Sequence, residues 1–243
     1  MSTSQMNDHS NMAYGMLKYP PFAAEYDSVG PYSIGRDARL QLERSHAIKC
    51  PPIICHLATL KKVQEVLSKP GELEKFLSAD EAAQIRRCDM PMYPLDESPA
   101  GLTGRSIATQ LHSAKDYVLK PSLEGGGHNV YRKDIPDFLA SIPMDEWHQY
   151  ILMKMISPPS LDNILISSEG VYRGSVVSEL GIFGTCMWRV KRTRERDEEK
   201  PEMLANNVGG WSLKTKREDV DEMSVIKGYG CFDSPLLVSS VLV

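Results

Sequence analysis

The segment that decides the fold reads Lys120-Pro121-Ser122-Leu123-Glu124-Gly125-Gly126-Gly127-His128-Asn129-Val130-Tyr131. It follows Tyr117-Val118-Leu119, a β-rich run that predicts a short strand. Three consecutive glycines let the backbone approach an anion and point several N–H groups at it, because no Cβ stands in the way. Lys120 adds positive charge, and Glu124 offers a hard oxygen ligand of the kind that Mg²⁺ prefers. The segment therefore predicts a loop that holds phosphate groups.

The run Gly125-Gly126-Gly127 alone has a second explanation, because three glycines are more often the flexible tip of a hairpin. A Walker A motif would end in Gly-Lys-Ser or Gly-Lys-Thr, and a dinucleotide fingerprint would have the pattern G-x-G-x-x-G. The segment contains neither pattern. The residues around the glycines therefore have to decide between a phosphate loop and a hairpin tip.

Helices are predicted on the N-terminal side of this loop, where apolar residues recur at helical spacing between proline-rich breaks. Ser78 and Glu81 form a capping box at the start of one helix. The polar face of another is expected to carry Lys61, Lys62 and Glu65. The expected helices are Arg36–Lys49, Leu57–Leu67, Glu72–Leu77, Ala79–Arg87 and Arg105–Ala114, with a loop over Pro91–Gly101.

Strands and tight turns are predicted from Tyr117 onward, interrupted by one helix over Pro136–Ser141. The run from Arg189 to Lys200 changes from basic to acidic, which favours a solvated hairpin tip over a binding patch. The other expected strands are Tyr150–Ile156, Asn163–Ser167, Val171–Phe183, Cys186–Val190, Trp211–Lys216 and Gly230–Phe232. Helices followed by a largely antiparallel sheet predict an α+β fold.

The composition is that of a folded globular chain. Its 243 residues, 42% hydrophobic and 25% charged, suit one large domain or two small ones. A formal net charge of -4 gives no basic field that would attract nucleic acid or anionic lipid. The apolar runs fall far short of the roughly 18 residues that cross a bilayer, and the polar N-terminus lacks signal-peptide features. We therefore expect a cytoplasmic protein with neither a nucleic-acid nor a membrane partner.

The five cysteines have no regular spacing, which predicts reduced thiols rather than a disulfide framework. Cys50, Cys55 and His56 raise the alternative of a zinc site. There is no second Cys or His pair at ligand spacing, so a loop that enters a helix is the favoured explanation of these residues.

The residues around the glycines resemble the KPQ-x-EGGGNN-x-Y loop of the eukaryotic-type glutathione synthetases, which are ATP-grasp ligases. Other segments resemble the same family in the same order, from about Asp37 to Pro235. These segments are Leu42–Pro51, Lys61–Gly71, Tyr150–Met153 (YILM in the family), Ser178–Gly184 (SELGIFG) and Leu213–Lys216 (LRTK). Six ordered blocks do not agree by chance, so the phosphate loop is favoured over the hairpin tip.

The resemblance implies an ATP-grasp-like α+β fold, in which a helical N-terminal part precedes a mainly antiparallel sheet with a glycine-rich phosphate loop and a C-terminal lid. The expected organisation is a disordered or irregular segment over 1–35, the ATP-grasp region over 36–238 and a tail over 239–243. The implied activity joins γ-glutamylcysteine to glycine through an acyl phosphate, with ATP as co-substrate, Mg²⁺ as cofactor and a homodimer as the assembly. Such phosphoryl transfer depends on positioning and charge neutralisation, so no catalytic side-chain nucleophile is expected.

The resemblance also implies a role for individual residues. Glu124 is the expected metal ligand, and the expected substrate contacts are Lys214, Val225 and Ile226. Backbone groups of the 153–156 segment are expected to contact adenine, Glu179 the sugar side, and the lysines the phosphates. The expected ATP contacts are Lys61, Lys120, Glu124, Gly125, Gly126, Gly127, His128, Asn129, Tyr131, Met153, Lys154, Met155, Ile156, Glu179, Lys216 and Glu222. Taken alone, Glu179 and Lys216 would also suit exposed positions of a strand.

The sequence departs from the family where substrate would bind. Lys214 replaces an arginine, and an ammonium cannot form the bidentate fork with a carboxylate. The family's lid GGVAAG is Met223–Gly228 here, where Ile226 and Lys227 are bulky. The family's FRxGY segment is not recognisable in Glu25–Gly30.

The chain is also expected to lack the family's N-terminal half, which supplies two further Mg²⁺ ligands and much of the substrate site. Three hypotheses follow from this. The chain is a glutathione synthetase or part of one, a diverged nucleotide-binding protein with a remodelled acceptor pocket and no ligase activity, or a truncated product that folds poorly alone.

Overall fold

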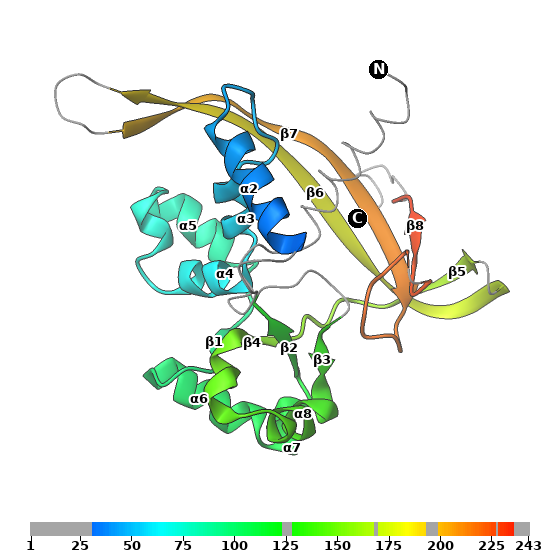
Figure 1. Ribbon diagram of the computed structural model, residues 1–243. Coiled ribbons are helices and arrows are strands. Elements are labelled where there is room, and N and C mark those ends of the chain that lie inside the picture. Colours follow the sequence, from blue (N-terminus) through cyan, green and yellow to red (C-terminus); the bar gives the residue numbers. More distant parts are fainter. Residues whose placement is uncertain (1–30, 123–127, 168–169, 193–198, 227, 236–243) are drawn as a thin grey trace. The chain divides into compact units, whose positions relative to one another are not determined.

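The computed structural model describes residues 31–122, 128–167, 170–192, 199–226 and 228–235 (Figure 1). The chain divides into two compact units, Met1–Ile156 and Ser157–Val243, and each is described by itself. Each unit contains a four-stranded antiparallel sheet, and the described helices belong to the first unit. The predicted α+β class is therefore confirmed.

The N-terminal helices differ in their bounds from the predicted ones. They are α2 (Pro31–Arg44), α3 (Ile53–Ala58), α4 (Lys61–Ser68), the 3-10 turn η1 (Leu73–Lys75) and α5 (Ala79–Arg86). The first was predicted to continue to Lys49, but the chain turns back after Arg44. Glu43 Oε1 accepts a hydrogen bond of 2.9 Å from the N–H of Ile53, the first residue of α3. A side chain of α2 thus satisfies a donor that the start of α3 leaves open.

The predicted helix Leu57–Leu67 is in fact two helices, because Leu60 is extended, with φ -62° and ψ 137°, at the N-cap of α4. The apolar repeat continues through this break, so periodicity alone did not reveal it. The predicted helix Glu72–Leu77 was also wrong, since only the single turn η1 forms there.

The capping box at the start of α5 is confirmed. The N–H of Ser78 donates to Glu81 Oε2 at 2.9 Å, and the N–H of Glu81 donates to Ser78 Oγ at 3.4 Å. The Ser78 hydroxyl also donates to Glu81 Oε2, at 2.7 Å, and this bond, together with the bond from the Ser78 N–H, lowers the pKa of Glu81. The box could be identified from sequence because both partners lie within one helical turn.

Glu65 was predicted on the polar face of its helix, and this prediction was wrong. Its side chain is buried, with 1% of the residue exposed. Glu65 Oε2 lies 3.2 Å from Lys62 Nζ, and Oε1 lies 3.0 Å from Lys69 Nζ. Two ammonium groups one helical turn away on either side therefore compensate the buried carboxylate, which allows it to face inward.

The first sheet has the strand order β1 (Met92–Pro94), β4 (Tyr150–Lys154), β2 (Tyr117–Pro121) and β3 (Val130–Tyr131). A loop was predicted over Pro91–Gly101, but this region contains β1 and the start of α6 (Pro99–Ala108). β1 tolerates its proline because it is an edge strand. Ser98 Oγ accepts from the N–H of Gly101 and caps α6.

The predicted helix Arg105–Ala114 ends early, at Ala108, and the separate helix α7 (Leu111–Ala114) follows after an extended Gln110. The helix predicted over Pro136–Ser141 is α8 (Ile135–Ser141), between the 3-10 turns η2 (Arg132–Asp134) and η3 (Met144–Gln149). Within the described ranges, none of the helices is long and apolar enough to cross a bilayer.

The core of the first unit lies between one face of this sheet and helices α6, α7 and α8. Leu95, Leu119 and Leu152 contribute from the sheet side. The helical side and η3 contribute Ala108, Ala114, Ile135, Leu139 and Trp147. Because side chains alternate along a strand, the neighbours of Leu119 and Leu152 belong to the other face of the sheet.

The second sheet has the order β5 (Leu161–Ser167), β6 (Gly170–Arg192), β7 (Glu199–Arg217) and β8 (Cys231–Asp233). Two strands, Val171–Phe183 and Cys186–Val190, were predicted where β6 is continuous. Gly184, between the two predicted strands, lies at an irregularity in the pairing of β6 with β7, between Phe183 and Gly184. β6 and β7 pair as far as Arg192 and Glu199, in agreement with the predicted hairpin, whose residues 193–198 lie outside the described ranges.

Gly104 determines how closely α6 approaches β1. A Cβ at this position would lie 2.8 Å from the carbonyl oxygen of Pro94 and 2.8 Å from the Cβ of Tyr93. Backbone atoms cannot move aside as the end of a flexible side chain can. Alanine therefore does not fit without a shift of α6 away from the sheet.

We expect Gly104→Ala to lower the free energy of unfolding by about 1 to 3 kcal/mol through overpacking. In an exposed helix position the same change would instead stabilise by about 1 kcal/mol. Urea unfolding followed by circular dichroism measures the difference, with Ser106→Ala on the exposed side of α6 as the control. A stabilised Gly104→Ala variant would contradict the close packing of α6 on β1.

Candidate functional site

Three residues predicted to contact ATP share one face of the first sheet. In the strand register, Val118 lies opposite Met153 on β4 and opposite Tyr131 on β3. Lys120 follows Val118 by two residues and therefore lies on the same face. This is the face that points away from the helical core, so Lys120, Met153 and Tyr131 can meet a common ligand there.

Asn129 belongs with this group. It precedes β3, and its Nδ2 donates to Tyr131 Oη at 3.2 Å. The phenol and the amide hold each other in place, which leaves the carbonyl oxygen of the amide as an acceptor for another group. The predicted loop residues Glu124, Gly125, Gly126 and Gly127 lie outside the described residues.

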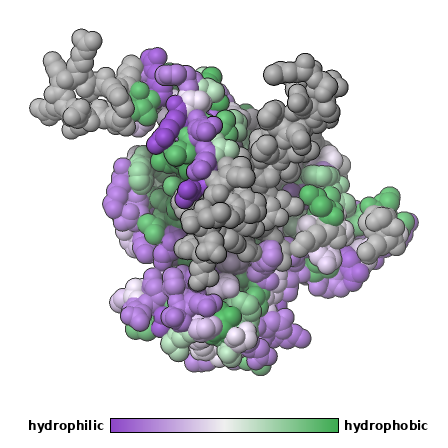
Figure 2. Space-filling model, viewed as in Figure 1, coloured by the Kyte–Doolittle hydropathy of each residue, from purple (hydrophilic) through white to green (hydrophobic). Residues whose placement is uncertain are grey.

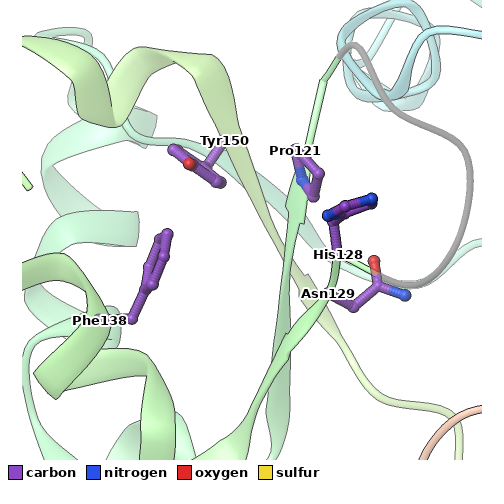
Figure 3. Close-up of a pocket in the computed structure, with 5 residues that line it drawn as sticks. All are labelled: Pro121, His128, Asn129, Phe138 and Tyr150. Carbon is purple, nitrogen blue, oxygen red and sulfur yellow. The ribbon is translucent and has the colours of Figure 1, made fainter. Parts of the chain in front are cut away.

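A cavity of about 280 Å³ lies next to this loop (Figure 3). Phe138 comes from α8 and Tyr150 from β4, and their rings make an edge contact with centroids 5.4 Å apart. Figure 3 shows His128 and Asn129 at the start of β3 on the other side of Pro121. Its volume lies close to the lower end of the roughly 300 to 1,000 Å³ of pockets that hold drug-sized ligands.

Lys61 is the first residue of α4 and is half-buried. Its Nζ donates to Gln64 Oε1 at 3.1 Å, and this partner is a neutral amide. Burial lowers the pKa of Lys61 below the ordinary lysine value. A phosphate group would supply the negative charge that a desolvated ammonium needs. Sequence reasoning did not identify Gln64, although its spacing of three residues from Lys61 within one helix was a usable signal.

The segment from Met153 to Ile156 was predicted to contact adenine through its backbone. The N–H of Lys154 donates to the carbonyl oxygen of Pro91, and the N–H of Met155 donates to that of Asp116, both at 2.9 Å. These two donors are therefore committed to the fold of the unit. A base bound along this segment would have to use other groups of it.

In the second unit, the register of β6 and β7 brings three predicted residues to one face. Glu179 lies opposite Lys214, and Val177 lies opposite Lys216. Lys214 Nζ donates to Glu179 Oε1 at 3.1 Å, with both side chains partly exposed. Lys214, predicted to bind a substrate carboxylate, thus already has a carboxylate partner.

Lys216 Nζ donates to the carbonyl oxygens of Val220 and Asp221, which belong to the connection between β7 and β8. These two carbonyl oxygens hold the ammonium group near the connection. The predicted contacts Glu222, Val225 and Ile226 lie farther along the same connection. Ile226 is fully exposed, and Lys227 lies outside the described residues.

Among the described residues, no group of three or more His, Cys, Asp or Glu side chains could hold a metal ion. Cys50, Cys55 and His56 accordingly do not belong to such a group. The described residues thus do not form a magnesium site by themselves, and Glu124, the predicted ligand, lies outside them.

The fold and these residues define an α+β protein of the ATP-grasp-like type, and comparison with known proteins identifies its family. Residues 3–237 match the family described as eukaryotic glutathione synthase, ATP binding domain, and the chain belongs to this family.

Similar proteins carry names from the same family. The glutathione synthetase large chain of Schizosaccharomyces pombe is 40% identical over 82% of this chain and 38% of its own length. The Homo sapiens glutathione synthetase is 36% identical over 82% of this chain and 40% of its own length. The chain thus spans about 40% of the length of these relatives.

A glutathione synthetase-like effector from Globodera pallida, solved in its apo form, is similar in structure. It has a TM-score of 0.54 and 25% sequence identity, over 83% of this chain and 40% of the effector chain. The agreement supports the ATP-grasp-like assignment of the fold.

Substitutions of Lys61 and of its neighbour Lys62 are expected to change the stability of the protein in opposite directions. A lysine with a lowered folded pKa destabilises the fold while it is charged, and the penalty disappears as pH rises from the folded pKa through the unfolded one. We therefore expect Lys61→Met to raise the unfolding midpoint at pH 7, with a smaller gain near pH 10.5. Lys62→Met should lower the midpoint, because it removes a partner of buried Glu65. Thermal unfolding at the two pH values measures this, and a destabilised Lys61→Met would contradict the role of burial.

Proposed function

We propose that this chain binds ATP and forms the nucleotide-binding part of a ligase of the glutathione synthetase type, which joins γ-glutamylcysteine to glycine. The observation that carries the proposal is the family match over residues 3–237. The geometry of each unit supports it, because in both sheets the predicted contacts gather on one face.

In the first unit, the proposed nucleotide contacts combine positive charge with polar groups. Lys120 and Lys61 would neutralise phosphate oxygens, and the paired Asn129 and Tyr131 would offer hydrogen bonds close to the strand that carries Lys120. His128 and the glycine loop are proposed to wrap the triphosphate through backbone N–H groups. Met153 to Ile156 would lie along the base.

In the second unit, Glu179 and Lys216 are the proposed nucleotide contacts, with Glu222 from the connection after β7. Lys214 and the 225–226 segment are proposed to contact substrate. Glu179 is well placed to accept from a sugar hydroxyl, because its carboxylate is partly exposed beside Lys214. Lys216 is proposed to contact a phosphate, and the carbonyl oxygens of Val220 and Asp221 position its ammonium group.

Magnesium is proposed to enter with ATP, with Glu124 as a protein ligand. Mg²⁺ keeps several waters and commonly binds through one or two carboxylates and the phosphates of a substrate.

The proposed ligase chemistry has two steps. A carboxylate oxygen of γ-glutamylcysteine attacks the γ-phosphorus of ATP, and ADP leaves. The glycine amine then attacks the carbonyl carbon of the acyl phosphate, loses a proton, and expels inorganic phosphate. Both steps depend on charge neutralisation and on the exclusion of water. The lysines of this chain would contribute the charge neutralisation.

A second candidate function is nucleotide binding without ligation, and the Lys214–Glu179 pair favours it. A substrate carboxylate would have to compete with Glu179 for the ammonium of Lys214. The lysine also lacks the bidentate geometry that an arginine offers. In this case the acceptor pocket is remodelled while the nucleotide contacts remain.

Isothermal titration of the purified chain with Mg-ATP tests the nucleotide site. We expect Lys120→Gln to weaken ATP binding by about 10 to 100 fold, since a charge-assisted hydrogen bond contributes about 1.5 to 3 kcal/mol. Lys115→Gln, the matched control, removes the same charge from an exposed position of the same unit and should leave affinity unchanged. Equal effects of the two variants, or no ATP binding at all, would contradict the proposed site.

A phosphate-release assay with each substrate omitted in turn separates the two functions. A ligase requires both γ-glutamylcysteine and glycine for full release. If the chain binds ATP but neither substrate stimulates phosphate release, the ligase proposal fails and nucleotide binding without ligation is supported.

A further inference from the structure

Thr215 has a buried hydroxyl that the proposed function does not use. Its residue exposure is 0%, and it lies between Lys214 and Lys216 on β7. Because side chains alternate along a strand, the hydroxyl points to the face opposite the two lysines. A buried hydroxyl without a partner would be unfavourable by about 1 to 3 kcal/mol.

Residues from the neighbouring strands satisfy this hydroxyl. Thr215 Oγ1 donates to Asp233 Oδ2 on β8 at 2.8 Å and lies 2.8 Å from Ser178 Oγ on β6. Since the one proton of Thr215 goes to the carboxylate, Ser178 has to donate to Thr215. Asn163 Nδ2 on β5 donates to the same carboxylate oxygen at 3.5 Å. We call Asn163, Ser178, Thr215 and Asp233 the hydroxyl–carboxylate network, which has one member on each strand of the sheet.

The network fits only one register of β7. A slip by one residue would turn Thr215 toward the face of Glu179 and would send Lys214 and Lys216 to the opposite face. It would also separate the Thr215 hydroxyl from Asp233. Burial, and then the charge of Asp233, raise the pKa of the Cys231 thiol.

We propose that Thr215 and Asp233 are positioning residues, which hold Lys214 and Lys216 on the ligand-facing side of β7 and thereby set the affinity for a nucleoside triphosphate. They act through the backbone of β7. The identity of the ligand rests on the proposed function, whereas the placement of the two ammonium groups does not. The same network fastens β8, where the connection that carries Val225 and Ile226 ends.

Three variants of the network test this role by titration with Mg-ATP. Thr215→Val keeps the shape of the side chain but removes the hydroxyl, and we expect ATP affinity to fall about tenfold, because the lysines on β7 are then positioned less precisely. Thr215→Ser should restore it to within a factor of two. Asp233→Asn should weaken binding in the same direction as Thr215→Val. Thr185→Val, an exposed threonine of β6, is the matched control and should have no effect.

A double-mutant cycle distinguishes positioning from a general loss of stability. In the background of Lys216→Ala, Thr215→Val should weaken ATP binding less than twofold, because the group through which it acts is gone. If Thr215→Val still weakens ATP binding tenfold in the Lys216→Ala background, the proposal is overturned. An unchanged affinity of Thr215→Val would overturn it as well.

A second measurement does not depend on ATP binding. The ¹³Cε and ¹Hε signals of Lys214 and Lys216 report the surroundings of their ammonium groups in the free protein. We expect both lysine signals to shift in Thr215→Val and to return in Thr215→Ser, while Thr185→Val leaves them unchanged. If the wild-type chain binds no ATP, the proposed function fails, and unshifted lysine signals would separately overturn the positioning role.

Discussion

The register of β6 against β7 is the constraint on which the second unit depends. Side chains alternate with a period of two, so one register determines which residues share a face. The pairing of Glu179 with Lys214, and of Val177 with Lys216, gathers the charged groups on one side. The same register sends Thr215 to the other side, where Ser178 and Asp233 satisfy it. A single register of β6 and β7 therefore both gathers the charged side chains on one face and buries Thr215 on the other.

In the first unit, too, the alternation of side chains along a strand places apolar and charged residues on opposite faces of the sheet. Alternation along β2 sends Leu119 into the helical core and Lys120 to the opposite face. Lys61 is positioned by burial at the start of α4, where desolvation lowers its pKa. Such a lysine lowers the stability of the ligand-free protein and suits a site that binds an anion. Functional groups of this kind are often maintained at the expense of stability.

Structural features that depend on residues close together in the sequence could be predicted, and features that depend on packing could not. The Ser78–Glu81 capping box lies within one turn and was predicted correctly. The break at Leu60 was missed because the apolar repeat continues through it. The burial of Glu65 was missed because it depends on how α4 packs, with Lys62 and Lys69 compensating the carboxylate. The candidate residues came from a family resemblance, which the family match bears out, but their faces required the strand register. The residue roles, the domain boundaries, the Mg²⁺ ligand, the homodimer and the cytoplasmic location remain predictions.

The central claim is that one register presents the charged residues of β6 and β7 on a single face. Cross-strand nuclear Overhauser effects between backbone protons of the isotope-labelled chain test it most directly. The account predicts contacts that pair Glu179 with Lys214 and Val177 with Lys216. A ladder displaced by one residue, with Glu179 opposite Thr215, would contradict it.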